Sequence, residues 1–219
     1  MFETTLRSLP TSNWLSLMLI FSFFLFVGFK LIYKERLFQN YIVFFSNKYF
    51  LNFGKDSKSI FNSYFLISYF FQCLFLTLFA FTYFKFNPND LFSENLLTFG
   101  ILAGIINVYF IGKLLIGLLF KIVFDISTIY ESVTFQKVSY LTSIAFLLFP
   151  LLIISNYSQF YPEKIFKISL ILFIILLLYR YLMLVLNNKL LIVSYLFYFI
   201  LYLCTVEIAP FIIFYKLKF

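Results

Sequence analysis

Two ionisable side chains interrupt long apolar stretches of this sequence, and they are the first candidates for chemistry. Glu207 lies in an apolar run near the C-terminus, and Lys113 lies in another run near the middle of the chain. A charged group inside hydrocarbon is costly and is therefore rare unless it is paired or functional. Glu207 has two interpretations. It exchanges protons or binds a cation, or it is a hydrogen-bonded carboxyl that fixes helix packing beside Pro210.

Two further polar residues accompany Glu207 and Lys113. With ~1.5 Å of rise per residue, Glu207 lies ~7 Å outward of its helix midpoint and Lys113 lies ~7 Å inward of its own. We therefore expect no direct pair, and we expect Lys113 to extend its ammonium group to the inner surface. Asn107 is a predicted partner of Glu207. Arg180 lies between two tyrosines, and this pattern predicts an anchor that reaches the inner interface.

The composition determines which elements position these residues. Of 219 residues, 63% are hydrophobic and 12% are charged, whereas about 25% are charged in soluble domains. Runs of ~20 apolar residues are long enough to cross ~30 Å of hydrocarbon, and lipid requires them to be helices. The sequence predicts an all-α transmembrane helical bundle, forming a single integral membrane domain over residues 1–219. The predicted spans are six, at about 13–33, 64–84, 96–120, 138–157, 165–185 and 190–215.

The basic residues predict an orientation. The first, third and fifth connections between spans hold 11 lysines and arginines, whereas the second and fourth hold 3. The positive-inside rule then places the odd-numbered connections in the cytoplasm and both termini outside. The net charge of +8 is interpreted as attraction to anionic lipid at the cytoplasmic face. We expect no nucleic-acid partner, because no binding motif accompanies the charge.

Two connections are themselves predicted to be helical. The first, at about 34–63, has apolar residues at helical spacing, and this predicts an amphipathic helix on the inner membrane surface. It is either a platform for a partner or anionic lipid, or a simple interfacial anchor. The third connection has a similar stripe and is expected to extend the third span into the interface. Its stripe consists of Ile122, Ile126, Ile129, Tyr130 and Val133.

Small residues and prolines predict where helices pack. Gly100 and Gly104 form a GxxxG pair that favours close helix approach, within the chain or between protomers, and Asn107 continues the same face. Pro150 predicts a kink in the fourth span. Pro210 frees a backbone carbonyl near Glu207.

The sequence contains no recognisable catalytic constellation. Histidine is absent, and Cys73 and Cys204 lie far apart, without metal-ligand spacing. No phosphate-binding loop, nucleophile elbow or zinc-protease motif is present. We therefore predict no catalytic residues, no cofactor and no metal.

The ordered residues of the second half resemble a known family. They include the stretch Gly112–Phe120, Tyr130, the run Phe149–Leu152, Leu178–Arg180 and the closing Leu201–Pro210, which reads YLCTVEIAP after its first leucine. This pattern is similar to a family of unknown function, made up of small inner-membrane proteins from Bacteroidota. The resemblance implies a bacterial inner membrane, and hence periplasmic termini. It implies no activity.

Three functional hypotheses follow. The first is a non-enzymatic subunit or scaffold of a cell-envelope assembly, with a membrane-protein partner or a second copy of the chain. The second is a small transporter or proton-coupled channel centred on Glu207. The third is a lipid-handling enzyme at the inner surface. A water-accessible cavity that reaches Glu207 favours the second, and a sealed bundle with an exposed GxxxG face favours the first. A groove open to lipid beside acidic residues favours the third.

Overall fold

The computed structural model describes five long helices, within residues 13–34, 63–87, 95–124, 127–158 and 161–187. The predicted interfacial helix at 34–63, the sixth predicted span, Glu207, Pro210 and Cys204 lie outside these ranges. The described part contains helices and no strand, so the all-α class is confirmed. The helices are α1 (Asn13–Ile32), α4 (Ser63–Phe86), α5 (Leu96–Phe124), α6 (Ser127–Tyr157) and α7 (Pro162–Asn187).

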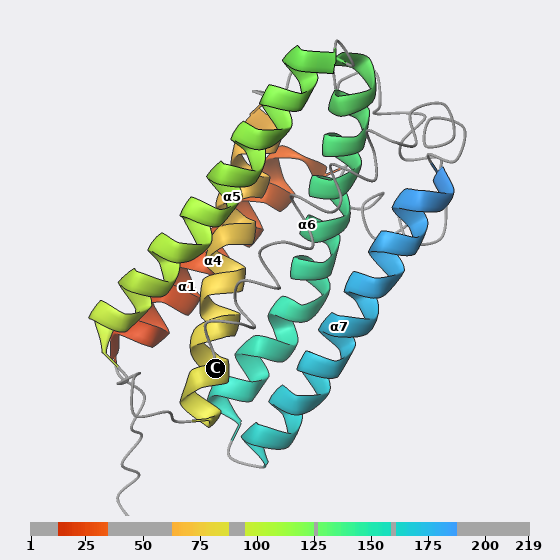
Figure 1. Cartoon of the computed structure of the whole chain (residues 1–219). Helices are drawn as coiled ribbons and strands as arrows, with labels where there is room; N and C mark the ends of the chain where they lie inside the picture. The colour runs from red at the N-terminus through yellow and green to blue at the C-terminus, as the bar shows by residue number, and fades with distance from the viewer. Residues whose placement is uncertain (1–12, 35–62, 88–94, 125–126, 159–160, 188–219) are drawn as a thin grey trace, which may run out of the picture.

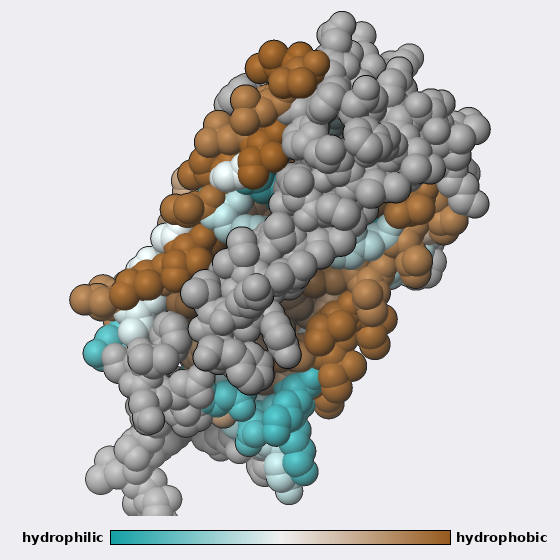
Figure 2. All heavy atoms as spheres, in the orientation of Figure 1, coloured by the Kyte–Doolittle hydropathy of each residue, from teal (hydrophilic) through white to brown (hydrophobic). Residues whose placement is uncertain are grey.

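All five helices are long and apolar enough to cross a membrane. The hydrophobic side chains face outward over much of the coloured surface, and hydrophilic ones gather near the lower end of the view (Figure 2). A water-soluble protein would bury such side chains, whereas a bilayer solvates them. The chain is therefore a multi-pass membrane protein.

Helix α6 is the centre of the bundle. It contacts α4, α5 and α7, while α1 packs against α4 (Figure 1). Its contact face carries small residues, among them Ser139, Thr142 and Ala145, all at most 1% exposed. Without a hydrophobic drive between helices in lipid, close approach of backbones through small residues provides the packing energy. Pro150 lies inside α6 on its exposed side and does not end the helix.

Aromatic rings fill the space between α1, α4 and α6. Phe146 is the hub: its ring centroid lies 4.7 Å from that of Phe71, 5.0 Å from that of Phe26 and 5.2 Å from that of Phe29. Such tilted and offset ring contacts add ~0.5–1.5 kcal/mol each beyond area burial. A second contact joins α4 to α7, because Phe79 lies 5.0 Å from Phe173.

The third connection follows its prediction only in part. Helix α5 extends the third predicted span by four residues, to Phe124, but a second helix begins at Ser127 and contains the rest of the connection. Tyr130 lies against α5, where its ring leaves no room for a Cβ at Gly117. Lys121 and Glu131 form a 2.7 Å ion pair between the two helices. These contacts hold α5 and α6 antiparallel, as the helical hairpin in Figure 1 shows. The apolar stripe is thus divided between two helices.

Candidate functional site

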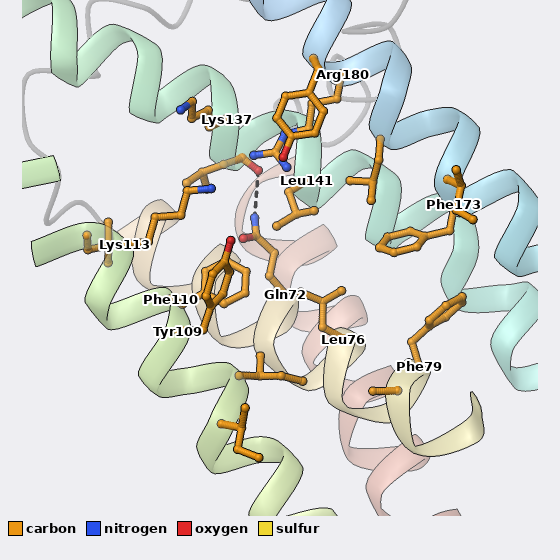
Figure 3. A pocket seen from close by; sticks show the side chains of 18 of the residues that line it. Gln72, Leu76, Phe79, Tyr109, Phe110, Lys113, Lys137, Leu141, Phe173 and Arg180 are labelled. Atoms are coloured by element: carbon orange, nitrogen blue, oxygen red, sulfur yellow. Dashed lines mark hydrogen bonds between the residues drawn. The ribbon is translucent and has the colours of Figure 1, made fainter. Parts of the chain in front are cut away.

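A cavity of about 680 Å³ lies among four of the helices, bordered by residues of α4, α5, α6 and α7 (Figure 3). This volume is in the range of sites that hold one small organic molecule, roughly 300–1,000 Å³. Most of the lining is apolar, and the polar residues gather toward one end. The candidate site is therefore a chamber of uneven polarity.

Three basic residues from three different helices border the cavity: Lys113 from α5, Lys137 from α6 and Arg180 from α7. From the helix bounds, Lys113 and Arg180 lie ~4 and ~8 Å beyond the midpoints of α5 and α7, toward their C-terminal ends. Lys137 lies ~8 Å before the midpoint of α6, toward its N-terminal end. Because α5 and α7 both run antiparallel to α6, these displacements point toward the same half of the bundle. The three positive charges therefore lie in one layer of the membrane, well inside the helix ends.

Arg180 differs from its prediction as an interfacial anchor. It is only 7% exposed, and its guanidinium carbon lies 5.6 Å from the ring centroid of Tyr181. Helix α7 continues about two turns beyond it, to Asn187. The side chain is directed into the bundle rather than out to the interface. A buried guanidinium requires hydrogen-bond acceptors or a counter-charge in its surroundings.

Lys113 also differs from expectation, whereas the prediction for Asn107 stays a prediction. Lys113 borders the cavity and is half-buried, with its ammonium 5.9 Å from the ring centroid of Tyr109, so it does not simply extend to the inner surface. Asn107 donates a 2.8 Å hydrogen bond to the carbonyl of Ala103 in its own helix. Its predicted pairing with Glu207 falls outside the described residues.

The polar end of the cavity is organised by Gln72, which the sequence analysis did not single out. It is 1% exposed. Its amide nitrogen donates to the carbonyl of Val138 at 2.9 Å and to the hydroxyl of Thr142 at 2.7 Å. Thr142 donates its own proton to Val138, so its oxygen is an acceptor and the orientation of the amide is determined. An isolated glutamine within an apolar run was the available signal.

The far end of the cavity is apolar. Leu76 and Phe79 lie one and two turns from Gln72 along α4, and Phe173 lies two turns from Arg180 along α7. Figure 3 shows these three side chains on the side of the cavity away from the basic residues. Seven residues of helix correspond to ~10 Å, so this is the distance between the polar and apolar ends.

The GxxxG pair is not part of this site. Nothing lies within 4 Å of a Cβ placed at Gly100 or Gly104, and the neighbouring Ile101, Ile105 and Val108 are exposed. Among the described helices the pair therefore makes no close contact. The glycine that does allow close approach is Gly117, beside Tyr130.

Helices, cavity and basic cluster together define a multi-pass membrane protein with an internal site. A family model described as "Domain of unknown function (DUF4271)" matches residues 15–217. The match covers most of the chain, so the protein belongs to this family. No curated protein and no solved structure matches it.

Proposed function

We propose that the chain is a small membrane transporter whose substrate path includes the cavity beside Lys113, Lys137 and Arg180. One observation supports this above the others: three helices each direct a basic side chain to the same internal space. Charges in hydrocarbon mark substrate or ion pathways in membrane proteins, because a structural role is served more cheaply by apolar residues. A scaffold needs no such cluster.

Glu207 keeps its predicted role in this proposal. It is the one acidic residue within a predicted span, and a carboxyl inside the membrane is a suitable group for proton coupling. The proposal also places the chain in the bacterial inner membrane, with both termini on the periplasmic side. The basic half of the bundle would then lie toward the cytoplasm.

A second candidate function is the assembly subunit. The open faces of Gly100 and Gly104 favour it, since they provide a surface that another helix can approach closely. The lipid-handling enzyme gains no comparable observation. A groove open to lipid beside acidic residues was its predicted signature, and no acidic residue occurs among the cavity-lining residues that the structure describes.

Cysteine accessibility tests transport without knowledge of the substrate. In a background with Cys73 and Cys204 replaced by serine, Ile106→Cys places a thiol beside the cavity, and Val108→Cys places one on the outward face of the same helix. Thiol reagents attack the thiolate, which requires water. We expect a membrane-impermeant reagent to label Ile106→Cys at least ten times faster than Val108→Cys.

Inside-out and right-side-out vesicles refine this test. A transport path predicts labelling of Ile106→Cys from both sides, and an anionic reagent should outpace a cationic one because the basic cluster attracts it. Equal labelling rates at the two positions, or complete protection of Ile106→Cys from both sides, would contradict a transport path.

A further inference from the structure

The cavity residues also identify the class of ligand, and this step shares its site with the proposed transport function. We propose that the cavity binds a single-chain anionic amphiphile. Its phosphate or carboxylate headgroup lies at the end formed by Lys113, Lys137 and Arg180, and its tail lies against Leu76, Phe79 and Phe173.

The charges at this end of the cavity favour an anion. Lys113, Lys137 and Arg180 come from three helices and border the same space. No acidic residue occurs among the lining residues that the structure describes. A phosphate or carboxylate is therefore the headgroup that complements this lining.

The donor chemistry suits a phosphate or carboxylate. A guanidinium offers planar, paired donors that match these oxyanions, and ammonium groups add compact charge from other directions. Lys113 and Lys137 come from helices that the Lys121–Glu131 pair and the Tyr130 contact hold together. Two of the three basic residues are thus attached to one helical hairpin and Arg180 to α7, so none of them lies on a loop.

Gln72 gives this end a defined shape. Both amide protons are committed to Val138 and Thr142, so the side chain holds α4 against α6 and directs its carbonyl oxygen elsewhere. This carbonyl oxygen can accept a hydrogen bond from a basic side chain or from a headgroup hydroxyl, but it cannot donate one to an anion. We therefore assign anion binding to the basic residues and positioning to Gln72.

The apolar end of the cavity favours a ligand with an apolar tail. A free inorganic anion would need a small polar site, whereas this cavity continues for ~10 Å into apolar and aromatic surface. Its volume corresponds to one modest ligand, which favours one chain over two. A molecule with a charged head and an apolar tail matches both ends at once.

The experiment uses the full-length chain, purified in a neutral detergent, and measures binding by native mass spectrometry. The probes are lysophosphatidic acid, a long-chain fatty acid, monoacylglycerol of the same chain length, diacyl phosphatidylglycerol and inorganic phosphate. We expect the two single-chain anions to bind at least tenfold more tightly than monoacylglycerol. Equal affinities for the charged and neutral single-chain lipids would overturn the proposal, as would phosphate alone competing as well as lysophosphatidic acid. Tighter binding of the diacyl lipid would overturn the single-chain assignment.

Matched variants locate the two ends. Arg180→Gln should weaken lysophosphatidic acid binding at least tenfold and leave monoacylglycerol unchanged, whereas Lys167→Gln removes a charge from the exposed surface and should change neither. Leu76→Trp, which fills the apolar end, should weaken long-chain probes more than Leu66→Trp on the exposed face of α4. Equal effects within either pair would place the ligand elsewhere. Lys137→Gln replaces Arg180→Gln if the latter does not fold.

This result is separable from the transport proposal. Binding of the anionic amphiphile together with a cavity closed to thiol reagents would reject transport and keep the ligand assignment. A cavity open to the thiol reagents, with no preference for anionic amphiphiles, would keep the transport proposal and reject the ligand assignment.

Discussion

Helices α5 and α6 are of similar length and equally able to cross a membrane, yet the protein uses them in opposite ways. Two thirds of the spanning part of α6 is buried (67%), against 11% of that of α5. Helix α6 buries hydroxyl-bearing side chains such as Ser139 and Thr142, while α5 exposes glycines and large aliphatic residues. The comparison teaches that small and polar residues stabilise a membrane helix only where another helix meets them.

The aromatic hub on α6 should produce the largest difference between the two helices. Phe146→Ala removes a ring that contacts three other phenylalanines and should lower the free energy of unfolding by about 3 kcal/mol, by analogy with core truncations. Leu119→Ala on α5 removes a side chain that is 61% exposed and should change it by less than about 0.5 kcal/mol. Unfolding in dodecyl sulfate mixed micelles, followed through the fluorescence of Trp14, measures both.

Trp14 is a suitable reporter because it is the one tryptophan of the chain and contacts Phe81 of α4 and Phe99 of α5. Similar losses for Phe146→Ala and Leu119→Ala would mean that α5 is covered as fully as α6, and the contrast between the helices would disappear.

Gly117 provides an intermediate effect within α5 itself. Gly117→Ala introduces a methyl group that collides with the phenol of Tyr130 and should destabilise the α5–α6 hairpin by about 1–2 kcal/mol. Gly104→Ala meets open space and should be neutral or slightly stabilising, because alanine favours helices over glycine. Thermal unfolding in detergent compares them, and Tyr130→Leu should restore most of the stability lost in Gly117→Ala.

If Gly104→Ala proves the more harmful of the two, its face is occupied in the assembled protein. That outcome would favour the assembly-subunit candidate over the transporter.

These contrasts show how far the sequence predicts this molecule. The length of the apolar runs alone predicted the all-α fold and membrane insertion. In lipid, the backbone N–H and C=O groups of each run must hydrogen-bond within that run, and this local requirement makes the run a helix. Helix ends were less predictable. The apolar stripe of the third connection predicted helix before Val138, but not that these residues begin a separate helix, α6. That division depends on contacts between helices that Lys121, Glu131 and Tyr130 make, which periodicity does not reveal.

The candidate site was predictable only in its residue types. Lys113 and Arg180 stood out as charges in apolar runs, but each was interpreted separately as reaching the inner surface, and Lys137 was not singled out. Their convergence on one cavity depends on how α6 lies between α5 and α7. Gln72 was missed for the same reason: its importance comes from Val138 and Thr142, 66 and 70 residues away.

The side-chain hydrogen bonds of Gln72 and Asn107 should produce the smallest changes in stability, and they test the contrast between α5 and α6 most directly. Gln72→Leu removes two hydrogen bonds between α4 and α6 and should cost about 1 kcal/mol, since interhelical hydrogen bonds in membranes average ~0.6 kcal/mol. Asn107→Leu removes a bond within α5 alone and should cost close to nothing. A double-mutant cycle of Gln72→Leu with Thr142→Val should give a coupling energy of about 0.5 kcal/mol, whereas Asn107→Leu with Thr142→Val should give none. Coupling in the second cycle equal to that in the first would show that α5 and α6 share a polar network, and that the division between an inner and an outer helix is wrong.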